Sequence, residues 1–484
     1  MAAVFLLLNT AAFASSDAQA LHLLNRLAFG PSPGDVQRVS AMGVEQYIRE
    51  QLHPDSIPLP KQLQAQLAAL DTLKLTPTEL FNDYGPPLGA LMKPTPQVIK
   101  QYRQHARVIM QQAAQSRLLR AVESPRQLQE VMTAFWFNHF NVFAGKGLDR
   151  LWVGSYEAHA IRPYALGHFS KLLMATAQSP AMLFYLDNWL DSQPGTPRAR
   201  GRFDGINENY AREIMELHTL GVNSGYTQAD VTTLAHILTG WGLCPRKGPF
   251  ARPGGFCFDP MRHDFSDQVF LGTDLKGGGE GEVRRALLML ADSPATAHHL
   301  SYELAQYFVA DHPPPALVER LSKTWMHSDG DIAVVLQQLF ESPEFWSVRN
   351  RGNKFKTPYE YVISMARASG MQFTDVPAQS KLMLGMMARL GEPLFGCVTP
   401  DGYKNTSEVW LNPDAMMMRL SFATMAGVGR LDAGQQMQNP QALDAQLYDT
   451  LTGLFSSREM ASIDSQPARL RAGLILGSPQ FQYR

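Results

Sequence analysis

The sequence has little charge, few cysteines and no long apolar run. Only 18% of its 484 residues are charged and the formal net charge is −1. It therefore lacks the basic field that attracts nucleic acid or an anionic membrane surface. Only three cysteines are present, none in a CxxC pair, which argues against a zinc site of the usual spacing. After the N-terminal segment no apolar run approaches the roughly 20 residues of a transmembrane helix. We expect no nucleic-acid partner and no stable membrane insertion.

Several motifs of well-known enzymes are absent as well. The chain has no HExxH metal motif, no GxSxG between a strand and a helix, and no glycine pattern that binds phosphates or dinucleotides. The glycine-rich segment Gly277–Gly281 has no preceding strand and no following Lys-Ser/Thr, so we interpret it as a flexible loop. No motif requires a cofactor. The cofactor stays unknown, and a divalent metal or a haem stays open.

The N-terminal residues resemble an export signal. A short apolar run begins at Val4–Leu8, and Ala12-Phe13-Ala14 fits the small-x-small rule for cleavage before Ser15. No Lys or Arg precedes the run, so the alternatives are a start further upstream or a buried helix. We predict that residues 1–14 are a signal peptide and that the protein is periplasmic or extracellular.

Helical patterns dominate the remaining chain. Apolar residues recur with a period of 3.6 over Gln127–Phe143 and Arg284–Val309, and alternating runs occur only around Phe256–Phe258 and Gln268–Leu271. The predicted fold is all-α, a multi-helix globular array with a small β-hairpin insertion near 255–272. The composition is 45% hydrophobic, enough for a large core. A break near residue 370 divides a main helical domain, 15–370, from a C-terminal helical region, 371–484, packed on it.

Local signals mark helix starts and one loop. Thr76 and Thr357 each precede Pro and lie three residues before Glu, the pattern of a capping box, and Thr227 has Asp at that position. Cys244 and Cys257 flank a Gly/Pro-rich loop and could clamp it as a disulfide in an oxidising compartment. Buried free thiols are an equal alternative. Cys397 is left without a role.

One helix, predicted over Asn207–Gly221, is unusually rich in polar residues. At 100° per residue, Asn209, Glu213 and Glu216 form a stripe beside its apolar face. Two carboxylates three residues apart repel each other, and partial burial raises their pKa values, which suits general acid or base catalysis. The structural alternative is an ordinary ion pair between Arg212 and Glu216.

The segment Phe135–Asn141 is the second candidate. His139 continues the apolar face of its predicted helix, with Asn138 and Asn141 beside it and Trp136 on the same side. An inward histidine flanked by amides could be a base, a metal ligand or a substrate clamp. The alternative is a core histidine bonded to a backbone carbonyl.

Two further clusters complete the candidate set. His263 and Asp264 are adjacent on a loop after a predicted strand, and Asp187-Asn188 closes an apolar helix. His236 is predicted to point away from its helix's apolar face. The predicted catalytic residues are Glu213, Glu216, His139, His263 and Asp264. The predicted substrate-binding residues are Asn138, Asn141, Asp187, Asn188, Asn209, Arg212 and Trp136. Metal ligands stay unknown.

The motifs also carry a family resemblance. The chain resembles the bacterial family named domain of unknown function 1800 (DUF1800) over nearly its whole length. The stretches that carry the resemblance are Leu21–Gly30, Phe135–Phe140, Pro180–Asn188, Asn207–Val222, Tyr226–Gly242, His263-Asp264 with Leu271-Gly272, and Lys356–Arg367. Leu394–Pro400 departs from the proline-rich version of many members. The resemblance implies export and a co-encoded exported partner similar to alkaline phosphatases, but it implies no reaction.

These observations lead to three hypotheses of function. The first is an exported carboxylate acid/base hydrolase acting on envelope or extracellular glycan, with Glu213 as acid or base. The second is a metal-dependent or redox enzyme in a helical bundle. The third is a non-catalytic binding or assembly protein that partners the co-encoded exported protein.

Overall fold

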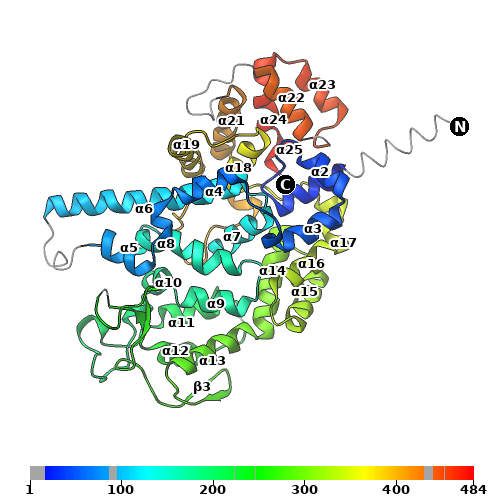
Figure 1. Ribbon diagram of the computed structural model, residues 1–484. Helices are drawn as coiled ribbons and strands as arrows, with labels where there is room; N and C mark the ends of the chain where they lie inside the picture. The colour runs from blue at the N-terminus through cyan, green and yellow to red at the C-terminus, as the bar shows by residue number, and fades with distance from the viewer. Residues whose placement is uncertain (1–16, 87–94, 223, 246, 430–439, 452) are drawn as a thin grey trace.

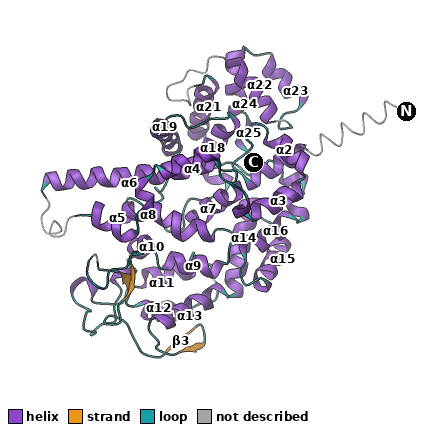
Figure 2. Ribbon diagram, in the orientation of Figure 1, coloured by secondary structure: helices purple, strands orange, loops and turns teal. Residues whose placement is uncertain are grey.

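The protein is an array of α-helices with two small antiparallel sheets (Figure 2). The computed structural model describes residues 17–86, 95–222, 224–245, 247–429, 440–451 and 453–484. This confirms the predicted all-α class with a small β insertion. The predicted signal peptide, residues 1–14, lies outside the described residues. Within them, no helix combines the length and apolarity that crossing a membrane requires.

The N-terminal half of the chain contributes about half of the helices. A helical stretch covers residues 17–27. It is followed by α2 (Asp35–Met42), α3 (Val44–Leu52), η1 (Pro54–Ser56), α4 (Lys61–Ala68), η2 (Asp71–Lys74), α5 (Pro77–Tyr84), α6 (Pro96–Glu123), α7 (Gln127–His139), α8 (Asp149–Tyr156), η3 (Glu157–Ile161), η4 (Arg162–Tyr164), α9 (Phe169–Ala177), α10 (Pro180–Tyr185), η5 (Asn188–Leu190), η6 (Gly201–Phe203), α11 (Glu208–Glu216) and α12 (Gln228–Leu238). The amino-terminal half of α6 extends away from the other helices, whereas α7 lies near the centre (Figure 1).

The β insertion follows α12. Strand β1 (Trp241–Leu243) pairs with β2 (Phe256–Phe258), and β3 (Gln268–Phe270) pairs with β4 (Thr273–Leu275). Both predicted strands exist, but the prediction that they pair with each other is wrong, because β2 pairs with β1 and β3 pairs with β4. Cys244, the residue after β1, forms a disulfide with Cys257, the middle residue of β2.

The C-terminal half returns to helices. These are α13 (Glu280–Ala291), α14 (Pro294–Phe308), α15 (Pro315–His327), α16 (Ile332–Phe340), α17 (Pro343–Trp346), η7 (Val348–Asn350), α18 (Pro358–Ala368), α19 (Val376–Arg389), α20 (Ser407–Trp410), α21 (Pro413–Gly427), α22 (Pro440–Thr450), α23 (Ser457–Asp464), α24 (Ala468–Gly477) and α25 (Pro479–Gln482). The periodic segment Arg284–Val309 is two helices rather than one. A new helix begins here because Pro294 occupies the first turn of α14 and the side chain of Ser293 caps it. Helix α13 therefore ends before these residues.

The predicted helix starts are mostly confirmed, whereas the end of the polar helix differs. Thr76, Thr227 and Thr357 all form capping boxes. Asn207 caps α11, but the helix ends at Glu216, before the predicted C-cap Gly221. Gly221 instead lies in the turn that follows, with φ +87°, where an added Cβ would lie 3.0 Å from the His299 ring. The chain there needs glycine to let α11 approach α14.

The C-terminal residues contact the main body directly. Phe355 and Tyr483 form an isolated antiparallel bridge, and Arg484 donates a hydrogen bond from its backbone to Lys354. Helix α18 packs against both α6 and α19. The division into regions 15–370 and 371–484 stays a prediction.

Candidate active site

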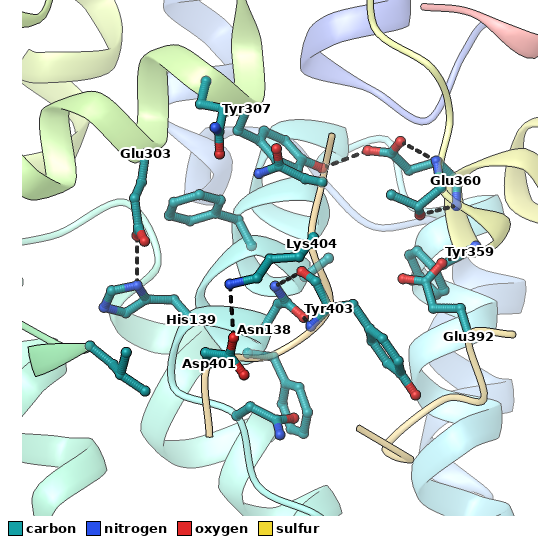
Figure 3. A pocket seen from close by; sticks show the side chains of 18 of the residues that line it. Asn138, His139, Glu303, Tyr307, Tyr359, Glu360, Glu392, Asp401, Tyr403 and Lys404 are labelled. Carbon is teal, nitrogen blue, oxygen red and sulfur yellow. Dashed lines mark hydrogen bonds and ion pairs between the residues drawn. The ribbon is translucent and has the colours of Figure 1, made fainter. Parts of the chain in front are cut away.

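A cavity of about 330 Å³ opens among five helices and one loop near the centre of the protein. Its walls come from the end of α6, from α7, α14 and the start of α18, together with the end of α11 and the loop 392–405. The lining combines carboxylates, amides and aromatic rings (Figure 3). The aromatic members are Phe135, Phe137, Tyr307, Tyr359, Phe395 and Tyr403.

The predicted residue His139 lies at one end of this cavity. It is the last residue of α7, and its Nδ1 lies 2.7 Å from Oε2 of Glu303 on α14 (Figure 3). Its Nε2 lies 3.2 Å from the backbone oxygen of His218. Both ring nitrogens therefore face acceptors, which an imidazolium satisfies completely. With no lone pair directed into the cavity, His139 is better suited to positioning a carboxylate than to acting as a base.

Glu303 is the carboxylate that these contacts position. His299, one turn earlier on α14, places Nε2 3.6 Å from Oε1 of Glu303 and 3.3 Å from the backbone oxygen of Leu217. Burial raises the pKa of Glu303, but the charges of His139 and His299 and the hydrogen bond from His139 outweigh it. The pKa therefore lies below its ordinary value, and Glu303 is a carboxylate at neutral pH.

The polar helix α11 contributes mainly through its C-terminal end. Leu217 and His218 follow the last helical residue. The backbone oxygen of Leu217 contacts the imidazole of His299, and that of His218 contacts the imidazole of His139. Carbonyls at a helix C-terminus have no partner in the helix, and the helix dipole there favours cations. The motif that stands out in the sequence thus presents acceptors that orient both histidines.

The acidic stripe of α11 lies at the edge of the cavity. Glu216 lines it, and Arg212 contacts Glu216 at 3.3 Å and Glu208 at 3.2 Å. The ion pair that we gave as the structural alternative is therefore present. Glu213 is not among the lining residues. Burial raises the pKa of Glu213, and the Glu216 and Asp401 carboxylates raise it further.

Asn138 and Asn141 organise the loop that covers the cavity. Asn138 donates from Nδ2 to the backbone oxygen of Tyr403 at 2.8 Å and accepts from its N–H at 2.7 Å. Asn141 donates to the backbone oxygens of Cys397 and Thr399. These side chains, predicted to bind substrate, have their polar atoms engaged by the protein backbone. They contribute to the site by positioning the loop.

The same loop brings two charges into the cavity. Asp401 and Lys404 form an ion pair at 2.8 Å (Figure 3). Gly402 lies between them with φ +65°, and an added Cβ would lie 2.3 Å from the backbone oxygen of Asn138. Close approach of the loop to α7 therefore requires glycine here.

Glu392 stands at the end of the cavity away from His139 (Figure 3). Its Oε2 accepts a hydrogen bond of 2.7 Å from the backbone N–H of Tyr359, in the first turn of α18. Burial raises the pKa of Glu392 to about 7, against the opposing effect of the hydrogen bonds from Tyr359 and Thr357. The nearby Glu360 carboxylate makes a smaller contribution to this rise. Glu392 can therefore hold a proton near neutral pH.

Three other predicted residues lie away from the cavity lining. Trp136 is fully buried and donates its indole N–H to the backbone oxygen of Ala165 at 3.0 Å. Asn188 is buried and donates to the backbone oxygen of Trp241 at 2.6 Å. Asn209 donates to the backbone oxygen of Leu186 at 3.1 Å. Each satisfies a backbone acceptor in the scaffold.

Asp187 forms an ion pair with a lysine. Its carboxylate contacts Lys146 at 2.8 Å, and its backbone is in the left-handed region with φ 61°. It is not among the residues that line the cavity.

His263 and Asp264 form a separate buried group beside the β insertion. His263 Nδ1 lies 2.8 Å from the backbone oxygen of Thr239, and its Nε2 lies 3.6 Å from Glu282. Asp264 pairs with His236 at 2.8 Å. His236 lies outside the buried face of α12, and its side chain is partly exposed. The loop folds back over that face of α12 and supplies a partner.

Sequence reasoning missed Glu303, His299, Glu392, Asp401 and Lys404. His299 and Glu303 are four residues apart on a helix, a spacing that faces both toward one side and could have marked them. Glu392 follows the end of α19 in a loop, where no periodicity indicates burial. In the part of the chain that the structure describes, no three His, Cys, Asp or Glu side chains are placed to hold a metal ion.

Comparison with known proteins identifies a family. Neither the curated proteins nor the solved structures contain a match to this chain. A family model described as "Protein of unknown function (DUF1800)" matches residues 22–483, nearly the whole chain, and the protein therefore belongs to the DUF1800 family.

Proposed function

We propose that the protein is an exported acid/base hydrolase in which Glu303 and Glu392 act on a glycan-type substrate. The observation that carries the proposal is one cavity with two carboxyl groups in opposite surroundings. Glu303 lies between two imidazoles, whereas Glu392 is half-buried and bonded to a backbone N–H. Environments that separate two carboxyl groups in this way assign one as base and the other as acid.

Each carboxyl group has a role that follows from its surroundings. Glu303, ionised, accepts a proton from water or stabilises positive charge that develops on the substrate. The pKa of Glu392 is about 7, so the group is protonated below that pH and donates its proton to the leaving oxygen. His139 and His299 hold Glu303 in place and keep it ionised.

The lining supports a hydroxyl-rich substrate. Aromatic rings, carboxylates and amides all line the cavity, which suits the apolar faces and polar edges of sugar rings. Glu216, Asp401 and Lys404 add further charged groups to the lining. The proposal thus keeps the carboxylate chemistry expected from the sequence but moves it from Glu213 to Glu303 and Glu392.

Glu392→Gln tests the assignment. Purified full-length protein is assayed for release of reducing ends from a panel of envelope and extracellular glycans. We expect Glu392→Gln to lower kcat by about 10²- to 10⁴-fold on the substrate that the wild type cleaves, and to remove the fall in rate above pH 7. The matched control is Glu319→Gln, which changes an exposed glutamate of α15 and should leave kcat unchanged.

Retention of wild-type kcat by a folded Glu392→Gln protein would contradict the proposal. A stoichiometric transition metal in purified protein would favour the metal-dependent alternative. If Glu392→Gln lost capture of the co-encoded exported protein without any change in turnover, the binding alternative would be favoured.

A further inference from the structure

A second cavity, of about 350 Å³, lies against α6, the helix that also contributes Arg117 to the candidate active site. It is bounded by α4, η2, α6, α8 and the π-helical segment η3. Its charged lining residues are Lys74, Arg120, Glu157, His159 and Arg162. Cations therefore outnumber carboxylates around this cavity.

A buried ion-pair network connects the two cavities. Arg117, which lines the candidate active site, contacts Glu157 at 2.5 Å, and Glu157 lines the second cavity. Arg162 contacts the same Glu157 at 2.5 Å and also pairs with Glu130. Arg120 reaches Glu130 only at 3.9 Å. Three guanidinium groups thus share two carboxylates, and one positive charge is left uncompensated.

Arg120 is the cation that the network leaves without a close partner. Its distance of 3.9 Å from Glu130 Oε1 is too long for a hydrogen bond, and its guanidinium makes none to the described residues. Glu130 Oε1 is buried without a hydrogen-bond partner. The side chain of Arg120 is 22% exposed, toward a cavity that it lines. A partly buried guanidinium without hydrogen bonds is costly unless a ligand supplies acceptors.

The backbone around the cavity is irregular at the same place. Residues Glu157–Ile161 form one turn of π-helix, which inserts a residue and directs Glu157 and His159 toward the cavity wall. Such turns recur at functional sites. Lys74 and His159 are exposed at the rim, and Lys74 also contacts Asp71 at 2.8 Å.

We propose that this second cavity binds a small oxyanion, a phosphate or a carboxylate group, on the guanidinium of Arg120. The planar fork of an arginine matches two oxygens of either group. Arg162, one of the other cations of the network, lines the same cavity. The bound anion neutralises the surplus charge of the network. The proposal does not depend on the reaction in the other cavity, because its measurement is binding alone.

Isothermal titration of the full-length protein with inorganic phosphate tests the site. A parallel titration uses malonate as a dicarboxylate, both at constant ionic strength set with sodium chloride. We expect saturable binding of one anion per chain, weakened at least tenfold by Arg120→Gln. The matched control is Arg107→Gln, an exposed arginine of the same helix α6, which should leave the affinity unchanged.

The two titrations assign the ligand. Arg120-dependent binding of phosphate, of malonate or of both supports the site and identifies the oxyanion class. Absence of binding, or binding that Arg120→Gln leaves intact, overturns the proposal. If Arg120→Gln does not fold, Ser116→Phe decides, because its ring would fill the cavity that Ser116 lines. Lost binding in that variant supports the site, and retained binding overturns it.

Discussion

Two histidine–carboxylate pairs in this protein use the same residue types in different surroundings. His139 and Glu303 meet at a cavity, and the Glu303 side chain is 29% exposed. His263 and Glu282 meet beside the β insertion with both side chains fully buried. The first pair can reach a substrate, whereas the second can only stabilise the fold. Residue type therefore marks both, but access separates the candidate active site from the scaffold.

The largest expected effect is on kcat, and it distinguishes Glu303 from Glu282. Glu303→Gln should lower kcat by about 10²- to 10⁴-fold, because a neutral amide neither accepts a proton nor stabilises positive charge. Glu282→Gln, the same change in the closed pair, should leave the kcat of the folded protein unchanged. Steady-state kinetics on the substrate identified by the glycan assay measures both. Equal loss of kcat in the two variants would contradict the assignment of the first pair to the active site and of the second to the scaffold.

The next effect is on stability and belongs to the closed pair. His263→Ala should lower the free energy of unfolding by about 3 kcal/mol, because it leaves a cavity in the core. The lost ring packs against Phe258 and Phe265, and its Nδ1 contacts the Thr239 carbonyl. Urea denaturation measures the change. An unaltered midpoint would show that this buried group is not a structural element.

A smaller effect is expected when the positioning histidine is changed. His139→Gln removes the imidazole that holds Glu303 and helps to lower its pKa. We expect kcat to fall by about 10- to 100-fold, less than for Glu303→Gln. The acidic limb of the pH–rate profile should also move to higher pH, since the Glu303 pKa rises toward its ordinary value. A fall in kcat without this displacement would indicate a merely structural role.

The sequence predicted the helices and one side of the site better than the other. Helical periodicity and the flanking amides single out His139, and the acidic stripe singles out Glu216, which does line the cavity. The capping boxes at Thr76, Thr227 and Thr357 are local patterns, so the sequence alone suffices to find them. The class of the fold followed from the same short-range signals.

The partners of these residues were not predictable in the same way. Glu303 lies 164 residues from His139 in the chain, and periodicity identifies a buried face without identifying what packs on it. Glu392 acquires its raised pKa only because the loop 392–405 folds over the first turn of α18. The separate strand pairs likewise depend on which segments meet in the fold, whereas the split of α13 from α14 follows from Ser293 and Pro294, a local signal that the sequence contains.

The most direct test of the central claim is a carbon-13 NMR titration of the glutamate side-chain carboxyls, assigned with Glu303→Gln and Glu392→Gln. It measures the asymmetry itself and needs no known substrate. We predict that Glu392 titrates near pH 7 and that Glu303 titrates below its ordinary value, which is about 4.3. Titration of both carboxyls together near pH 4 would contradict the assignment of one as acid and the other as base.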